Sequence, residues 1–145
     1  MKITLSGSLA FTNEIKGIAR KLEGMGHEVT IPMTSKDIID NKVTLEKIMQ
    51  EKEDGSIVDR GMKIDAIRRY YHKIKESDGL LVVNMDKNSI KNYIGGATLI
   101  EMGFAHALEK GLFLLNGIPE MKYTDEIKIM NPVVLNGDLE RIGKE

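Results

Sequence analysis

The sequence of 145 residues contains no cysteine and no tryptophan, and only three of its residues are proline. The lack of cysteine excludes disulfide bonds, a thiol nucleophile and thiolate metal sites. The three histidines, His27, His72 and His106, stand far apart in the sequence, which argues against a dedicated zinc site. We therefore expect no metal site.

An excess of positive charge and a long apolar run are lacking as well. Lys and Arg total 21 against 22 for Asp and Glu, so the chain has no basic surplus for binding a nucleic acid. No apolar run approaches the roughly 20 residues of a membrane-spanning helix, and the run at Met1–Leu5 is too short for a signal peptide. We expect a cytoplasmic protein with neither a nucleic acid nor a membrane as partner.

Short apolar runs alternate with helical patterns along the chain. The strands are predicted at 2–6, 28–32, 80–83, 112–115 and 132–135, and the helices at 11–25, 44–54, 62–77, 98–109 and 125–130, with a closing turn at 138–142. This alternation predicts one α/β domain over residues 1–145, with a doubly wound, five-stranded parallel sheet in the order 2-1-3-4-5. The irregular, charge-rich segment 33–60 is interpreted as a helical excursion or a mobile flap.

In such a sheet, ligands bind beyond the carboxyl ends of the strands, where the strand order reverses. The two loops at that point are 6–10 and 86–96. In the first, the amides of Ser6, Gly7 and Ser8 can hold a phosphate ahead of a helix, although an ordinary strand-to-helix turn explains them as well. In the second, Asp86 is either a sugar or base contact or a turn-capping residue, and Lys87 and Lys91 are each either solvated or a phosphate contact.

Glu101 is the carboxylate of greatest interest, because it falls within an apolar helical pattern that follows the second loop. Thr98 and Glu101 have the spacing of a capping box, in which the glutamate bonds back to the cap amide. The alternative is a functional carboxylate, which the positive end of the helix dipole would keep ionised. Gly103 favours the functional interpretation, because a glycine inside a helix suggests close approach of backbone or ligand.

Three segments of the chain resemble the nucleoside 2-deoxyribosyltransferase-like superfamily, which includes deoxynucleoside 5′-monophosphate N-glycosidases. They are 3–8 (ITLSGS), 74–83 (IKESDGLLVV) and 96–105 (GATLIEMGFA), with the lead-in 92–96 (NYIGG) typical of a small, largely uncharacterised branch. The most specific part is the pattern of Glu101, Gly103 and Ala105. The resemblance implies that Glu101 is a nucleophile that attacks C1′ of a deoxyribose, without metal or cofactor.

The resemblance further implies a nucleoside or nucleotide ligand held by Ser6, Gly7, Ser8, Asp86, Gly95, Gly96, Ala97 and Tyr70. Tyr70 and Gly95 stand where family enzymes commonly carry an aspartate and another polar residue. The acid or hydrogen-bond donor would then be Tyr70, His72, Tyr93 or Asp86. The reaction is either transfer to a second base or hydrolysis, and the competing function is a non-catalytic nucleotide-binding protein on the same scaffold.

Two further expectations concern packing. The apolar residues of 62–77, namely Ile64, Ile67, Tyr71 and Ile74, are predicted to form one core face. A homo-oligomer is expected, because the family completes its cleft from a neighbouring subunit and because segment 33–60 carries apolar residues such as Ile39 and Ile48.

Overall fold

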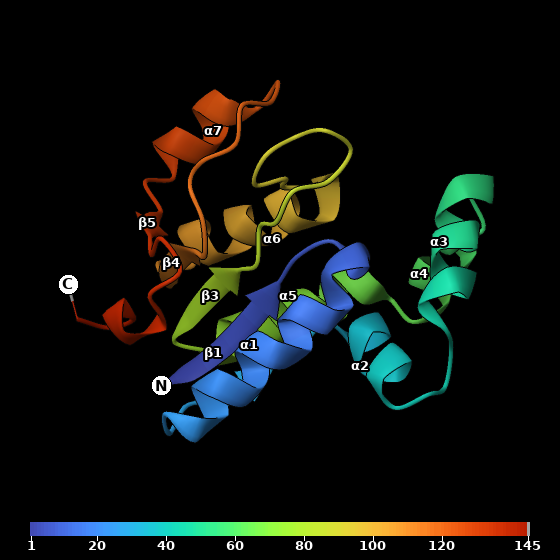
Figure 1. Ribbon diagram of the computed structural model, residues 1–145, viewed down its shortest axis with the longest axis horizontal. Coiled ribbons are helices and arrows are strands. Elements are labelled where there is room, and N and C mark those ends of the chain that lie inside the picture. The colour runs from blue at the N-terminus through green and yellow to red at the C-terminus, as the bar shows by residue number, and fades with distance from the viewer. Residues whose placement is uncertain (145) are drawn as a thin grey trace.

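The computed structural model describes residues 1–144 and shows a central sheet with helices on both faces (Figure 1). The strands are β1 (Lys2–Ser6), β2 (Glu28–Thr30), β3 (Gly79–Val82), β4 (Gly111–Leu114) and β5 (Val133–Val134). The helices are α1 (Thr12–Gly24), α2 (Met33–Ile39), α3 (Leu45–Asp54), α4 (Ile57–Lys63), α5 (Ala66–Glu76), α6 (Gly96–Ala107) and α7 (Thr124–Ile129), with the 3-10 helices η1 (Leu9–Phe11) and η2 (Leu139–Arg141).

All five strands are parallel and lie in the order β2-β1-β3-β4-β5, which confirms the predicted doubly wound α/β fold. Ser6 at the end of β1 pairs with Val82 at the end of β3. Because the strand order reverses between these two strands, the loops that follow them leave the sheet at the point where open α/β sheets bind ligands.

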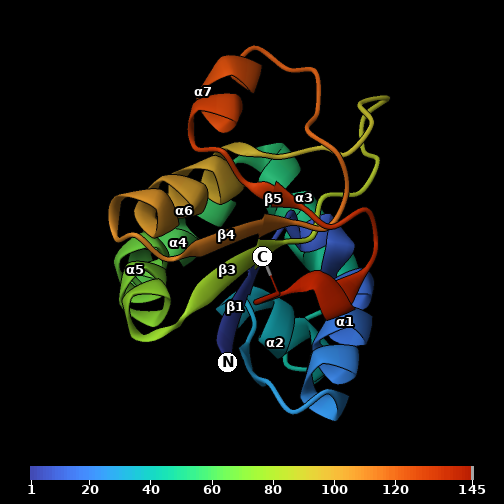
Figure 2. The same ribbon diagram turned by 90° about the vertical axis from the view of Figure 1, so that its left-hand side faces the viewer.

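Side chains alternate along the strands between two hydrophobic cores, as the pleat of a strand requires. Leu5 and Leu81 pack with Ile15 of α1 on one face, whereas Leu80 packs on the opposite face against α5 and α6. Figure 2 shows α1 on one side of the sheet and α5 and α6 on the other. Because Leu5 faces α1, the next residue, Ser6, faces α6.

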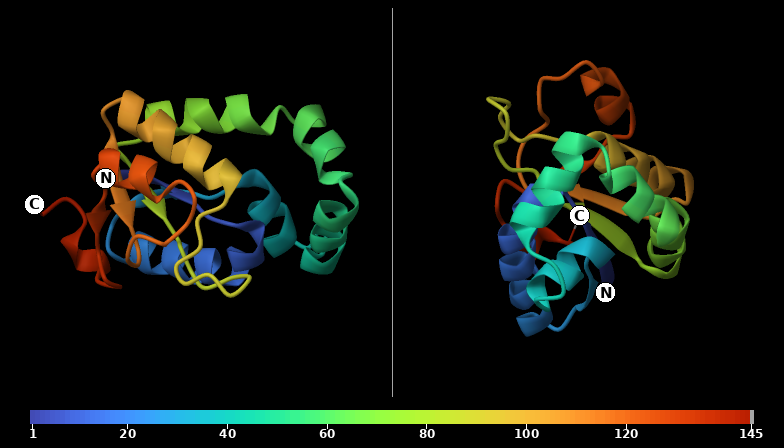
Figure 3. Two further views of the ribbon diagram at one scale, coloured as in Figure 1. Left: turned by 90° about the horizontal axis from the view of Figure 1, so that it is seen from above. Right: turned by 90° about the vertical axis from the view of Figure 1, so that its right-hand side faces the viewer.

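The segment between β2 and α5 forms a helical excursion at one end of the sheet (Figure 3). The excursion contains α2, which the sequence pattern missed, and α3, which begins one residue after its cap, Thr44. The single helix predicted at 62–77 is wrong at its start, since the chain turns at Asp65 (φ 51°) between α4 and α5. A bidentate ion pair from Arg60 to Glu51, at 2.6 and 2.7 Å, ties α4 to α3.

Two expectations concern the outside of the molecule. Within residues 1–144, no helix combines the length and the apolar character that crossing a membrane requires. Ile48, one of the apolar residues behind the expected homo-oligomer, is fully buried inside the protomer. It therefore offers no surface for assembly, and the oligomer stays a prediction.

Candidate active site

A hydrogen bond joins the end of β1 to helix α6. Ser6 is fully buried, and its hydroxyl donates to Oε1 of Glu101. The alternation of β1 explains the contact, because it turns the last side chain of the strand toward α6. Ser6, which was predicted to contact the substrate, therefore lies behind the carboxylate and orients it.

The start of α6 decides between the two interpretations of Glu101. The helix is preceded by Gly95 and begins at Gly96, so Thr98 lies inside the first turn and is buried. A capping box requires the threonine to occupy the cap position. The capping-box interpretation is therefore wrong, and the carboxylate in the second turn bonds to Ser6 instead.

Burial raises the pKa of Glu101 from its ordinary 4.5 to about 7, although the hydrogen bond from Ser6 acts to lower it. The expectation that the helix dipole keeps this group ionised is wrong, because the effect of the dipole falls off within the first turn. Within residues 1–144, no lysine, arginine or histidine nitrogen lies within 4.0 Å of the carboxylate. Glu101 is therefore about half protonated at neutral pH and lacks a cationic partner.

Glu101 lies in the wall of a cleft of about 530 Å³, bounded by the loop after β1, the start of α6 and the helices α4 and α5. Among residues 1–144, it is the only aspartate or glutamate that lines this cleft. Ser8, in the loop after β1, lines the same cleft as Glu101. The cleft brings together most of the predicted site: Gly7, Ser8, Tyr70, Gly95, Gly96, Ala97 and Glu101.

Tyr70 lines the cleft but is only 3% exposed, and its hydroxyl donates to the carbonyl oxygen of Leu5. Burial, and secondarily the charge of Glu101, raise the pKa of Tyr70 well above its usual value. The phenol is therefore a protonated donor already engaged by the backbone. Tyr71, which was predicted to belong to the core, is only partly buried and lies edge-on to the ring of Phe104.

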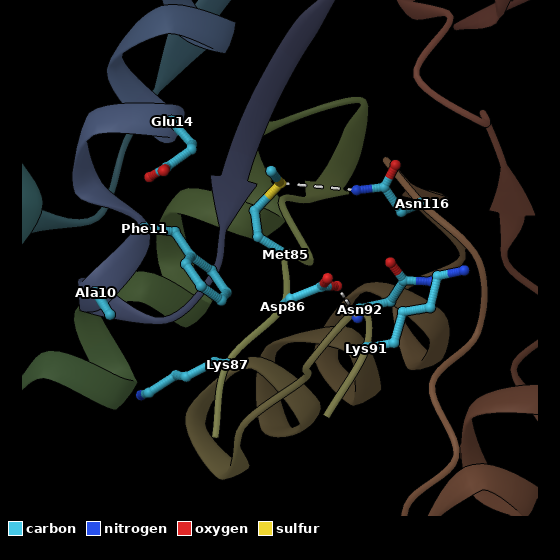
Figure 4. A pocket seen from close by; sticks show the side chains of 9 residues that line it. All are labelled: Ala10, Phe11, Glu14, Met85, Asp86, Lys87, Lys91, Asn92 and Asn116. Atoms are coloured by element: carbon cyan, nitrogen blue, oxygen red, sulfur yellow. Dashed lines mark hydrogen bonds between the residues drawn. The ribbon is translucent and has the colours of Figure 1, made fainter. Parts of the chain in front are cut away.

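Asp86 does not share the cleft with Glu101. It is exposed, and its carboxylate accepts a hydrogen bond of 3.0 Å from the backbone N–H of Asn92. It lines a second cavity of about 610 Å³, which lies between the start of α1 and the loops after β3 and β4 (Figure 4). The geometry matches the turn-capping interpretation of Asp86.

The helical excursion supplies a wall of the cleft that the sequence analysis did not assign to the site. Spacing placed Ile64 and Ile67 on a core face, but both line the cleft, and Ile67 is 55% exposed. The excursion also brings two cations to the cleft, Lys52 and the paired Arg60. Apolar spacing was the available signal, and it cannot distinguish a core face from the wall of an open cleft.

The structure also tests the surroundings of Gly103 and the potential metal ligands. A side chain at Gly103 would meet no atom within 4 Å, so the predicted close approach of another backbone segment is wrong, and the approach of a ligand stays a prediction. Among residues 1–144, no three potential metal ligands (His, Cys, Asp or Glu) come together. The geometry thus offers one partly buried carboxylate in the wall of the cleft, with the backbone of Gly95, Gly96 and Ala97 also lining it.

Comparisons of this chain with protein-family models, with curated proteins and with solved structures gave no match. Membership of the superfamily named above therefore stays an expectation based on short motifs.

Proposed function

We propose that the protein acts on the N-glycosidic bond of a 2′-deoxynucleoside or its 5′-monophosphate, with Glu101 as nucleophile. The observation that carries the proposal is the Glu101 carboxylate itself, which lines the cleft, bonds to Ser6 and has no cation within 4.0 Å. A carboxylate that no protein cation neutralises is free to stabilise a positive charge on a ligand.

Such a charge develops in this reaction. Cleavage of an N-glycosidic bond passes through an oxocarbenium-like state at the anomeric carbon, which a nearby carboxylate stabilises or traps. An oxygen of Glu101 forms a bond to C1′ while the bond from C1′ to the base nitrogen breaks, and the base leaves with the electron pair and takes a proton from solvent. Water, or the nitrogen of a second base, then attacks C1′, loses a proton and releases Glu101.

The remaining residues that line the cleft fit the binding of a sugar. The backbone at Gly95, Gly96 and Ala97 offers amides at the start of α6, where the helix dipole favours oxygen-rich and anionic groups. Gly7 and Ser8 line the cleft from the loop after β1. These segments are also the ones that resemble the superfamily, which is the second support for the proposal.

One observation favours the second candidate, a nucleotide-binding protein without catalytic activity. Glycosidases commonly use two carboxylates, whereas Glu101 is the only carboxylate that lines the cleft among residues 1–144. Neither Tyr70, whose hydroxyl is engaged by the backbone, nor Asp86, which lies outside the cleft, supplies the second group.

The test is chromatography of free base from each 2′-deoxynucleoside and each 5′-monophosphate, with and without an acceptor base. Wild type should release base, and Glu101→Gln should not, because glutamine keeps the volume but loses the charge. Glu109→Gln is the matched control, since Glu109 is exposed just beyond α6 and does not line the cleft. Its activity should equal that of wild type.

Each other outcome selects an alternative. If wild type releases no base from any of these compounds but they raise its melting temperature, the binding protein is favoured. If Glu101→Gln retains base release, Glu101 is not the nucleophile.

A further inference from the structure

Two ammonium groups come together at the edge of the cleft. Lys87, in the loop after β3, donates from Nζ to the hydroxyl of Ser8 at 2.8 Å. Lys52, in α3, lines the cleft beside Ser8. Desolvation of its ammonium is the main cause that lowers the pKa of Lys52, and the ammonium of Lys87 lies close enough to lower it further. Two like charges placed together without a ligand are an unfavourable arrangement.

The loop holds Lys87 in a fixed position. The backbones of Lys87 and Ile90 exchange two hydrogen bonds, at 3.0 and 2.9 Å, around Asn88 and Ser89. Both of these turn residues have positive φ, at 53° and 62°, which is the geometry of a tight hairpin turn. The ammonium also lies 5.0 Å from the centre of the Tyr93 ring, in a cation–π contact.

The helix that carries the exposed residue Lys52 is anchored to the rest of the excursion. Glu51, the neighbour of Lys52, is buried and forms the bidentate pair with Arg60, and Ile48 of the same helix is fully buried. Within residues 1–144, neither Lys52 nor Lys87 has a carboxylate within 4.0 Å. The two cations are thus positioned by separate elements and left without an anionic partner.

We propose that Lys52, Lys87 and the Ser8 hydroxyl form a binding site for a phosphomonoester at the edge of the Glu101 cleft. A phosphomonoester carries between one and two negative charges at neutral pH and has three acceptor oxygens, which suits two ammonium groups and one hydroxyl. A neutral ligand would leave the two ammonium groups facing each other. One part of this proposal rests on the proposed function, namely that the phosphate belongs to a deoxyribose that reaches Glu101.

The test is isothermal titration calorimetry of the whole protein with 2-deoxyribose 5-phosphate, 2-deoxyribose and inorganic phosphate. Wild type should bind the sugar phosphate more tightly than either fragment. Lys52→Gln and Lys87→Gln should each weaken its binding about tenfold or more, the usual cost of losing a hydrogen bond to a charged group. Lys87→Arg should retain most of the affinity, because it keeps the charge.

Lys91→Gln is the matched control. It removes the same charge from the same loop, and like Lys87 it lines the second cavity, but its side chain points away from that of Lys87 (Figure 4). Its affinity for 2-deoxyribose 5-phosphate should equal that of wild type. A loss as large as in Lys87→Gln would overturn the site in favour of a general effect of positive charge, and so would unchanged binding in both Lys52→Gln and Lys87→Gln.

Base release, measured separately, distinguishes this site from the proposed function. Lysine-dependent binding of the sugar phosphate without any base release supports the phosphate site and refutes the enzyme. Base release combined with lysine-independent binding of the sugar phosphate overturns the phosphate site and leaves the enzyme standing.

Discussion

The ionisation of Glu101 should make folding less favourable as the pH rises. Its pKa is about 7 in the folded protein against an ordinary 4.5. Between these values the unfolded chain loses the proton while the folded protein retains it, so the free energy of unfolding falls with rising pH. Above pH 7, Glu101 is ionised in both states, and the free energy of unfolding is lowered by the full amount that the pKa difference sets. The pKa difference corresponds to at most about 3 kcal/mol, and water in the cleft reduces it because Glu101 is partly exposed.

Glu101→Gln isolates this loss of stability. Glutamine fills the same volume and still accepts a hydrogen bond from Ser6, but it does not ionise. The variant should resemble wild type near pH 4.5 and become more stable by up to about 3 kcal/mol at pH 8, or about 6–12 °C in Tm for a domain of this size. Every other titratable group is shared by the two proteins, so its contribution cancels in the difference.

Urea unfolding of wild type and Glu101→Gln at a series of pH values measures this difference directly. Glu109→Gln, at an exposed position, should follow wild type at every pH. A stability difference between Glu101→Gln and wild type that does not change with pH would refute the raised pKa. It would also contradict the inference that burial affects the pKa of Glu101 more than the hydrogen bond from Ser6 does.

Three other substitutions test the neighbouring contacts. Ser6→Ala removes a donor that lowers the pKa of Glu101, so the acidic limb of the pH profile of kcat/KM for base release should move to higher pH. Tyr70→Phe should lower the free energy of unfolding in urea by about 1 kcal/mol, because the hydrogen bond to the Leu5 carbonyl is lost, and should leave base release largely unchanged. Loss of activity at unchanged stability would instead make the phenol a catalytic group. Asn84→Ala should lower the free energy of unfolding by at least about 2 kcal/mol, because this fully buried amide donates to two carbonyls and accepts from one N–H of the loop after β4. A variant that unfolds at the same urea concentration as wild type would contradict this prediction.

The sheet could be predicted from the sequence because its signals are local and mutually consistent. The apolar run at β3 is typical of a strand buried on both faces, and the helical patterns between strands leave few possible topologies. The break between α4 and α5 could not be predicted, because Ile64 and Ile67 continue the apolar spacing across it. Both residues line a cleft, and apolar spacing alone does not distinguish the wall of a cleft from a core.

The site could be predicted only in part, for a related reason. The spacing of Thr98 and Glu101 fits both a capping box and a functional carboxylate, and the residue at which α6 begins decides between these two interpretations. Thr98 looks like a cap, yet the helix already starts at Gly96, and its cap residue, Gly95, makes no side-chain hydrogen bond to the first amides. Lys52 was missed because the residues that bring it beside Lys87 belong to the irregular excursion, whose path is set by tertiary contacts such as the ion pair of Arg60 with Glu51.

The electrostatics of the empty cleft are unfavourable at two places, and both would be relieved by one kind of ligand. When Glu101 ionises, no cation within 4.0 Å offsets its charge, and Lys52 and Lys87 repel each other without an intervening anion. Arg60, which could have neutralised a ligand, is already paired with Glu51. A ligand with a phosphate at one end and a developing positive charge at its anomeric carbon would satisfy both places at once. Natural proteins retain such destabilising arrangements mainly where function requires them. Removing the charge of Glu101 or of one of the two lysines should therefore raise the stability of the empty protein, while it weakens base release in the first case and phosphate binding in the second.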